Sequence, residues 1–385
     1  MTVSATPSIL KRSIDGTTLT EPTAIELEPD PSAQWSGALL EVRDLTVNFE
    51  TDDGIVRAVD SVSFDVHENE TLGIVGESGS GKSVTSMAVL GLLPRSAKIS
   101  GSVKLKGREL IGLRESEMRA IRGKAIAMVF QDALASLNPV LRVGDQIAEA
   151  ITVHEKKVPD KEIKRRVIEL LDLVGIPNPV ERAEQYPHEY SGGMRQRAMI
   201  AMSIANDPEV LIADEPTTAL DVTIQAQVLE VFERIQTRTR SSIILITHDL
   251  GVVAGVSDRV LVMYAGRQVE MTSVDELFYN PRHPYARGLL ASLPRVDGRR
   301  DERLNRIIGQ PPSLIFLPQG CAFHPRCDDA RLPAPCATQR PELRDIGNGH
   351  VSACHFAEEL PTLSTTDLAA TDAAETDAAA PEADG

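Results

Sequence analysis

The stretch "GESGSGKS", residues 76–83, is the strongest indication of the fold in this sequence. It follows the short apolar run "TLGIVG" (71–76), which is typical of a buried strand, and it precedes "VTSMAVLGLL" (84–93), whose apolar spacing predicts a helix. A glycine-rich loop between a strand and a helix, with the pattern G-x-x-x-x-G-K-[ST], binds nucleotide phosphates. The stretch therefore predicts a phosphate site inside an α/β domain.

Each part of this loop has its own chemistry. Gly76, Gly79 and Gly81 allow the backbone to bend so that successive N–H groups point inward, and these donors form an anion cradle with the N-terminus of the helix. Lys82 can reach the β- and γ-phosphates, and the hydroxyl of Ser83 can hold Mg²⁺. The loop residues expected to contact the nucleotide are Gly76, Ser78, Gly79, Ser80, Gly81, Lys82, Ser83 and Val84.

A second short strand ends in two carboxylates. The run "VLIADEP" (210–216) places Asp214 at the strand tip, where it suits the coordination shell of Mg²⁺. Glu215, the next residue, can orient or deprotonate an attacking water. Neighbouring side chains of a strand point to opposite sides, but both can reach one site at its frayed end. Asp214 and Glu215 are therefore the predicted magnesium ligand and catalytic carboxylate.

The rest of the central region alternates between strand and helix patterns. Strands are predicted at 39–50, 57–70, 209–214 and 242–249, and helices at 160–175 and 193–206. Strands that alternate with helices favour an α/β core with a largely parallel sheet.

The two ends of the chain differ from its body. Residues 1–36 lack periodicity, and residues 357–385 are low in complexity and acidic, so both ends are expected to be disordered tails. From about residue 291 proline becomes frequent and periodicity fades. The predicted organisation is a tail at 1–36, a nucleotide-binding domain at 37–290, a small module at 291–356 and a tail at 357–385.

Charge and hydropathy limit the partners and the compartment. The formal net charge is −16, and the two tails carry −11 of it, so the body has no basic surplus for a nucleic acid. No run approaches the roughly 18 apolar residues of a membrane span, and the N-terminus lacks a secretion signal. A soluble cytoplasmic protein that binds no nucleic acid is expected.

All four cysteines lie near the end of the chain. Cys321, Cys327, Cys336 and Cys354 are separated by 5, 8 and 17 residues, unlike the paired C-x₂-C of common zinc folds. In a reducing compartment such clustering indicates metal ligands rather than disulfides. Residues 295–356 are too poor in apolar residues to fold by burial alone, and a four-thiolate centre can fold such a segment. Ligand type leaves zinc and a [4Fe–4S] cluster both open.

The segment "EYSGGMRQRAMIAMSIANDP" (189–208) provides the first family resemblance. Its run Tyr190 to Met194, "YSGGM", resembles the LSGGQ signature of the ATP-binding cassette (ABC) ATPases. A serine and two glycines that open a helix form a second anion cradle. In this family each ATP lies between the phosphate loop of one subunit and the signature of another. The resemblance therefore implies that Ser191, Gly192 and Gly193 contact a nucleotide held by a second ATPase subunit.

Other positions resemble the family's motifs in the expected order. Gln131 in "VFQD" resembles the residue that senses the γ-phosphate and Mg²⁺, and Asp221 in "TALD" resembles the anchor of the loop at the dimer seam. His248 in "ITHD" resembles the switch histidine, and Phe49 resembles the aromatic that stacks on adenine. The resemblance implies catalytic roles for Glu215, His248, Gln131 and Lys82, and Mg²⁺ ligation by Ser83, Gln131 and Asp214.

Longer matches narrow the family. The stretches "QDALASLNP" (131–139), "ADEPTTALDVTIQAQ" (213–227) and "GQPPSL" (309–314) resemble the ATPase subunits of dipeptide and oligopeptide permeases. This implies a P-loop NTPase core with an antiparallel β subdomain and a helical subdomain, and an irregular C-terminal metal-cluster module. It also implies an ATP hydrolase at the cytoplasmic face of the cell membrane. The implied partners are a second homologous ATPase subunit, two membrane-spanning permease subunits and a peptide-binding protein.

The resemblance also bears on the metal and on the alternatives. These ATPases carry a similar cysteine set with an iron–sulfur cluster, which favours a [4Fe–4S] cluster over zinc on the four cysteines. The cargo stays open, because related importers carry nickel, glycosides or siderophores and the ATPase never touches the cargo. The single cassette and the acidic balance disfavour a soluble ABC ATPase of DNA repair or translation. A redox-responsive regulatory ATPase is a further alternative.

Overall fold

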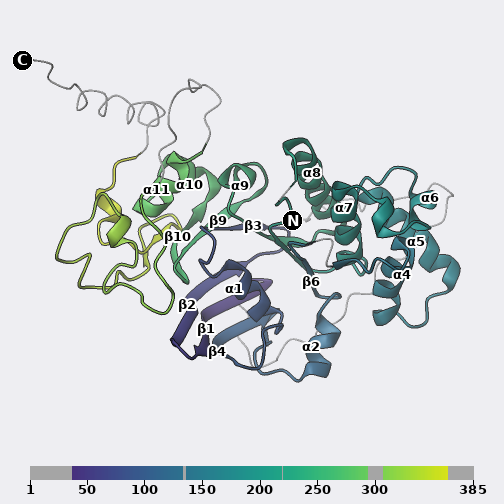
Figure 1. The fold of residues 1–385 in the computed structure, drawn as a ribbon, viewed down its shortest axis with the longest axis horizontal. Helices are drawn as coiled ribbons and strands as arrows, with labels where there is room; N and C mark the ends of the chain where they lie inside the picture. Colours follow the sequence, from purple (N-terminus) through teal and green to yellow (C-terminus); the bar gives the residue numbers. More distant parts are fainter. Residues whose placement is uncertain (1–36, 133–135, 219, 294–306, 363–385) are drawn as a thin grey trace, which may run out of the picture.

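The computed structural model describes residues 37–132, 136–218, 220–293 and 307–362, and Figure 1 shows their arrangement. The predicted tail at 1–36 lies outside the described residues, as does most of the predicted acidic tail. Residues 133–135 of "DALASLNP" and Ala219 of "TALD" also lie outside them.

An eight-stranded sheet forms the centre of the molecule, in the order β11-β12-β10-β9-β3-β8-β7-β6. Its parallel strands are β3 (Thr71–Val75), β6 (Ile126–Val129), β7 (Val210–Asp214), β8 (Ser242–Thr247) and β9 (Arg259–Tyr264). The next strand, β10 (Arg267–Ser273), returns antiparallel to β9. The parallel strands are almost continuously buried, which is the pattern of a sheet covered on both faces. The predicted α/β core with a largely parallel sheet is confirmed.

Helices cover one face of this sheet (Figure 1). Leu211 and Ala213 of β7 belong to the hydrophobic cluster on this face, whereas Val210 and Ile212 point to the other face. The helices on this face are α7 (Gly192–Ser203) and α8 (Val222–Thr239), and a 3₁₀ helix at Pro187–Glu189 leads into α7. The helices α4 (Val143–His154), α5 (Asp160–Leu173) and α6 (Pro179–Ala183) pack on α7 and on one another beyond the β6 edge (Figure 1). Throughout the described ranges, no helix is both long enough and apolar enough to span a bilayer.

A four-stranded antiparallel sheet lies over the other face. Its order is β2-β1-β4-β5, formed by β1 (Leu40–Thr51), β2 (Gly54–Val66), β4 (Ala97–Leu105) and β5 (Arg108–Glu109). The helices α1 (Lys82–Val89) and α2 (Glu115–Ile121) share its hydrophobic cluster. The helix predicted at 84–93 is α1, and it ends earlier because Gly91 takes a positive φ of 59° just after the cap residue.

The C-terminal part of the chain packs on the β10 edge of the main sheet. After α9 (Leu250–Val256), α10 (Val274–Tyr279) and α11 (Pro284–Ala291), two short strands extend this sheet, namely β11 (Arg344–Asp345) and β12 (Val351–Ser352). Short 3₁₀ helices lie at His324–Arg326 and Ala357–Glu359. Arg282 Nη1 donates to the carbonyl oxygen of Leu360 at 2.6 Å, so packed contacts continue past the predicted boundary at residue 356.

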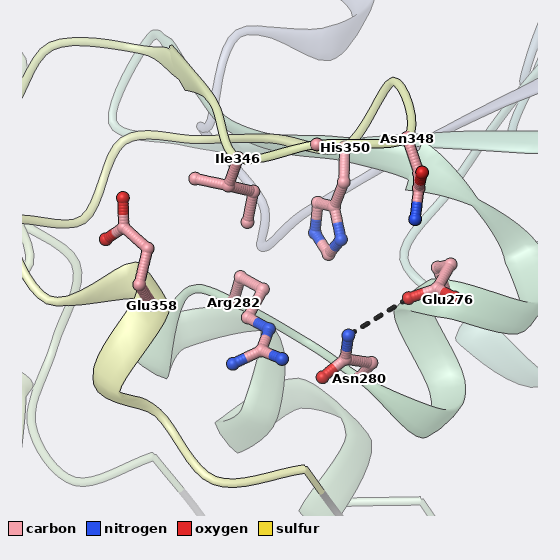
Figure 2. A pocket seen from close by; sticks show the side chains of 8 residues that line it. Glu276, Asn280, Arg282, Ile346, Asn348, His350 and Glu358 are labelled. Atoms are coloured by element: carbon pink, nitrogen blue, oxygen red, sulfur yellow. Dashed lines mark hydrogen bonds between the residues drawn. The ribbon is translucent and has the colours of Figure 1, made fainter.

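A pocket of about 190 Å³ lies between α10 and the loop before β12 (Figure 2). His350 connects the loop before β12 to β10, since its Nε2 lies 2.7 Å from Oε1 of the fully buried Glu270. The backbone N–H of Arg282 donates to the same carboxylate oxygen, and Asn280 donates to Glu276 at 3.1 Å. Burial raises the pKa of Glu270. The His350–Glu270 contact fastens the C-terminal segment to β10, and the Arg282–Glu270 contact ties the chain after α10 to the same strand.

Candidate functional site

The stretch 76–83 connects β3 to α1 at the carboxyl end of the parallel strands. Gly76 and Gly81 have φ angles of 155° and 101°. A Cβ atom on Gly76 would lie 2.2 Å from the carbonyl oxygen of Met263, and one on Gly81 would lie 2.4 Å from that of Ala58. Only glycine fits so close to neighbouring backbone. Close contact with neighbouring backbone therefore requires glycine at both positions.

Lys82 and Ser80 are buried polar side chains of this loop. Lys82 is 5% exposed, and its Nζ donates to the carbonyl oxygens of Gly76 at 2.7 Å and Glu77 at 3.1 Å. Burial lowers the pKa of Lys82, while the nearby carboxylates of Glu215, Asp214 and Glu77 act in the opposite direction. Ser80 Oγ is buried and has no hydrogen-bond partner among the residues that the structure describes. A buried ammonium and an unpaired hydroxyl fit an anionic ligand such as the phosphates of a nucleotide.

The side chains of Ser83 in α1 and Asp214 in β7 are in contact. Ser83 Oγ donates to Asp214 Oδ1 at 3.0 Å, and Asp214 is 6% exposed. Burial raises the pKa of Asp214, and the hydrogen bond from Ser83 opposes this shift. A divalent cation prefers oxygen ligands of this kind and would favour the ionised carboxylate. The residues present therefore fit the predicted Mg²⁺ site.

Glu215 is the centre of a hydrogen-bonded group. Its Oε2 accepts from Gln131 Nε2 at 3.0 Å and from Thr218 Oγ1 at 2.8 Å. Its Oε1 lies 3.5 Å from His248 Nδ1. Glu215 has a φ of 48°, so a left-handed backbone interrupts the strand alternation directly after Asp214. The structure thus brings the predicted catalytic residues Glu215, Gln131 and His248 together.

Phe49 lies near the end of β1, opposite Val56 of β2 and Ala97 of β4. It is half-buried and packs against the hydrophobic cluster that includes α1. In the part of the chain that the structure describes, no hydrogen bond or ring contact joins Phe49 to the phosphate loop. Its adenine contact stays a prediction.

The predicted signature begins α7. Ser191 Oγ accepts a hydrogen bond from a backbone N–H of the first helical turn at 3.3 Å. Ser191 and Gly192 are exposed, whereas a Cβ on Gly193 would lie 2.6 Å from Cγ2 of Ile224 in α8. Across the described residues, no hydrogen bond joins this segment to the phosphate loop. The start of α7 is thus open to contacts from outside the chain.

Asp221 caps α8 next to this signature. Its Oδ1 accepts from the backbone N–H of Ile224 at 2.9 Å, and Asp221 is exposed. Ile224 is the residue that meets the position of Gly193. The two capped helix starts therefore lie side by side, which is where the sequence predicts contacts at a dimer seam.

The cysteines of the C-terminal segment line one small cavity of about 20 Å³. All four, Cys321, Cys327, Cys336 and Cys354, are free thiols. Burial raises the pKa of Cys327 to about 12 and that of Cys354 to about 11, and neighbouring cysteines add to these shifts. Within the described ranges, no three His, Cys, Asp or Glu side chains form a group that could hold a metal ion. The structure gathers the predicted thiols without forming a metal-binding group.

Three contacts of the site were not predicted from the sequence. Thr218 donates to Glu215, and the hydroxyls of "TTAL" are the only local sign of this. The carboxylate of Glu77 accepts hydrogen bonds from Arg326, and the backbone N–H of Glu77 donates to the hydroxyl of Tyr285. No sequence pattern connects these distant residues to the loop.

Two family models match the chain. The model described as "ABC transporter" matches residues 59–218, which include the phosphate loop, Gln131, the signature and the pair at 214–215. The model described as "Oligopeptide/dipeptide transporter, C-terminal region" matches residues 269–333, which include the first two cysteines.

Peptide transport ATP-binding proteins of other organisms are similar to most of the chain. The "Oligopeptide transport ATP-binding protein OppD" of Mycobacterium tuberculosis is 52% identical over 330 residues, which are 86% of this chain and 54% of that protein. The chain thus spans about half the length of this mycobacterial relative. The protein of the same name from Bacillus subtilis is 55% identical over 287 residues, which are 74% of this chain and 80% of the relative.

A solved structure shares the fold. It is the "dimeric structure of a post-hydrolysis state of the ATP-binding cassette MJ0796 bound to ADP and Pi", with a TM-score of 0.55 and 24% sequence identity. The match covers 61% of this chain and 98% of that chain.

Proposed function

The chain belongs to the family of oligopeptide and dipeptide transport ATP-binding proteins of the ABC class, and on this premise we propose that it hydrolyses ATP to power peptide uptake. The observation that carries the proposal is the convergence of Lys82, Asp214 and Glu215 at the carboxyl end of the main sheet. The names of the relatives support di- or oligopeptides as the cargo.

The phosphate loop holds the triphosphate. An ammonium group has three donors, and Lys82 uses two of them on backbone carbonyls, so one is left for a phosphate oxygen. The unpaired Ser80 Oγ can donate to a second oxygen. Ser83, Asp214 and the Oε1 atom of Gln131 are the ligands for Mg²⁺, which neutralises charge on the phosphates when bound.

Glu215 acts on the attacking water. Its carboxylate is held by Gln131 and Thr218, which fixes the direction in which it accepts a hydrogen bond. It orients the water and takes its proton as the water oxygen bonds to the γ-phosphorus. The bond from that phosphorus to the bridging oxygen breaks, which releases ADP and phosphate. His248, beside Glu215, donates to the γ-phosphate.

A second ATPase subunit completes the site. Ser191 and Gly192 are exposed at a helix start, where backbone N–H groups favour an anion. They face a nucleotide held by the partner, and the partner's signature faces the nucleotide on Lys82. We expect a homologous sister subunit in this role, with Asp221 at the seam and Phe49 stacked on adenine.

Membrane subunits dock beside Gln131. Phe130 is 44% exposed and Val140 is 75% exposed, so apolar side chains flank the segment 131–139, through which we expect closure of the ATPase dimer to reach the membrane subunits. Exposed apolar groups at one place favour a protein contact. The assembly comprises two membrane-spanning permease subunits, a peptide-binding protein and the two ATPases. The chain therefore works at the cytoplasmic face of the membrane.

The C-terminal cysteines hold a [4Fe–4S] cluster, with zinc as the alternative. Support comes from the convergence of four free thiols on one cavity within a segment that has little regular structure. Deprotonation of buried thiols is unfavourable without a nearby cation, and a metal centre supplies that cation. Cys321, Cys327, Cys336 and Cys354 are the proposed ligands, and the role proposed for the cluster is to stabilise the fold.

The function is tested with the membrane assembly purified through a tag on this chain and reconstituted into vesicles with its binding protein. Di- and oligopeptides are expected to stimulate ATP hydrolysis and to accumulate inside. If only nickel, a glycoside or a siderophore stimulated ATP hydrolysis, that compound and not a peptide would be the cargo. Copurification with nucleic acid in place of membrane proteins would favour the non-transport ABC ATPases.

A further inference from the structure

Glu77, the second residue of the phosphate loop, is held at each of its polar groups. Its carbonyl oxygen accepts from Lys82 Nζ at 3.1 Å and from the backbone N–H of Ser80 at 3.2 Å. Its backbone N–H donates to the hydroxyl of Tyr285 at 2.8 Å. Its carboxylate accepts two hydrogen bonds from Arg326, at 2.6 and 2.9 Å. The first contacts are internal to the loop, and the others come from α11 and the C-terminal segment.

Arg326 is bound on every side. Its Nη1 and Nη2 atoms form the paired contact with Glu77, its Nε donates to the carbonyl oxygen of Ile308 at 3.1 Å, and Nη1 also lies 3.3 Å from the hydroxyl of Tyr264. The side chain is only 5% exposed. The Glu77 side chain is 28% exposed, so the pair is partly buried. A bidentate arginine–carboxylate pair has a fixed geometry that a lysine cannot reproduce.

The same arginine belongs to the cysteine segment. Arg326 ends the short 3₁₀ helix that lies between Cys321 and Cys327. Phe323 of this segment packs against Tyr264 and Tyr285, with ring centroids 5.2 and 5.3 Å apart. Whatever folds the cysteine segment therefore also fixes the guanidinium that holds Glu77.

We infer that Arg326 is a positioning residue for the phosphate loop, through which the C-terminal segment supports nucleotide binding. Arg326 fixes the Glu77 carboxylate, and thereby the carbonyl oxygen that orients Lys82. It also neutralises a negative charge beside the bound phosphates. This inference rests on the proposed ATP-binding function, and it adds a dependence of that function on the C-terminal segment.

The test is calorimetric titration of Mg·ATP into the full chain and its variants. Arg326→Ala is predicted to raise the Kd about tenfold or more, which corresponds to about 1.4 kcal/mol. Arg326→Lys is predicted to fall between Arg326→Ala and the wild type. Glu77→Gln is predicted to weaken binding in the wild-type background. On the Arg326→Ala background it should cost nothing further and recover part of the lost affinity, because the pair is already broken and the unneutralised charge is removed.

The matched control is Arg331→Ala. Arg331 lies in the same segment, pairs with the exposed Glu359 and stacks 3.6 Å over the ring of Phe356, away from the loop. Its removal is predicted to leave the Kd within twofold of the wild type. If Arg326→Ala disturbs folding, Glu77→Gln probes the same pair from the loop side without altering the segment.

The outcomes separate this inference from the proposed function. A wild-type chain that binds no ATP would refute the proposed function. A wild-type chain that binds ATP, with an unchanged Kd for Arg326→Ala or with additive effects of the two substitutions, would refute the positioning role alone.

Discussion

At the residue scale, Glu215 illustrates how one carboxylate is prepared for a reaction. Its Oε2 accepts hydrogen bonds from Gln131 and Thr218. It directly follows the buried Asp214 in the sequence, and its backbone is left-handed. A left-handed conformation of a non-glycine residue costs about 1–3 kcal/mol, and such residues concentrate at functional sites. The surrounding hydrogen bonds hold Glu215 in this conformation.

Thr218 provides a prediction at this scale. Thr218→Val keeps the shape of the side chain and removes the hydroxyl that donates to Glu215 at 2.8 Å. We expect ATP turnover by the assembly to fall about tenfold, since a hydrogen bond to a charged group contributes about 1.5–3 kcal/mol. The Kd for ATP is expected to stay within twofold. Thr218→Ser serves as the control and should restore turnover; equal turnover for all three proteins would exclude the role.

The residue scale also shows what the sequence predicts well. The side chains of Lys82, Ser83 and Asp214 meet as expected, because each follows a short apolar strand or opens a helix at a position that local patterns reveal. The partners of Glu77 could not be foreseen. Arg326 lies 249 residues away in sequence, and only the packing of the C-terminal segment brings it to the loop.

At the scale of secondary structure, the starts of α7 and α8 are built alike. Ser191 and Asp221 each accept a backbone N–H of the first turn with a side-chain oxygen. Such capping satisfies a donor that the helix itself cannot pair. Both starts lie at one surface, so the seam proposed for the partner subunit coincides with two ordered helix N-termini.

Asp221 tests this element directly. Asp221→Ala removes the acceptor for the N–H of Ile224 and is expected to lower the free energy of unfolding by about 1 kcal/mol. Asp221→Asn retains a capping oxygen and should cost much less. Thermal unfolding of the isolated chain, monitored by circular dichroism, measures both. Equal melting temperatures for the alanine variant and the wild type would show that the cap contributes nothing.

The same scale separates predictable from unpredictable elements. The predicted helix at 160–175 is α5, and the strand expected at 242–249 is β8, because both have long or strongly apolar local patterns. The strands β11 and β12 have two residues each and become strands only by pairing beside β10. No local pattern announces strands of that length.

At the scale of the whole molecule, the C-terminal segment is part of the support of the nucleotide site. It extends the main sheet through β12, buries the Glu270–His350 contact and reaches the phosphate loop through Arg326. The sequence suggested a separate small module, since its prolines and cysteines contrast with the periodic core. The contacts that join the C-terminal segment to the main sheet and to the phosphate loop are long-range, so no local sequence pattern reveals them.

The metal proposal makes a prediction at this scale. Wild-type chain purified without oxygen is expected to be brown and to contain about four irons per chain. Cys327→Ser should lose the iron and lower the melting temperature, because metal binding contributes to folding. Metal analysis and thermal unfolding measure both effects. A colourless protein with one zinc would replace iron by the zinc alternative, and a metal-free wild type as stable as Cys327→Ser would contradict both.

Photocrosslinking identifies the nucleotide that this chain's own site holds after turnover, and so shows whether Glu215 is the catalytic carboxylate. The assembly is incubated with radiolabelled 8-azido-ATP and Mg²⁺ and irradiated, and the nucleotide crosslinked to this chain is recovered. We predict the diphosphate on the wild type, and retained triphosphate on Glu215→Gln. Diphosphate on both, or no nucleotide on the wild-type chain, would contradict the account.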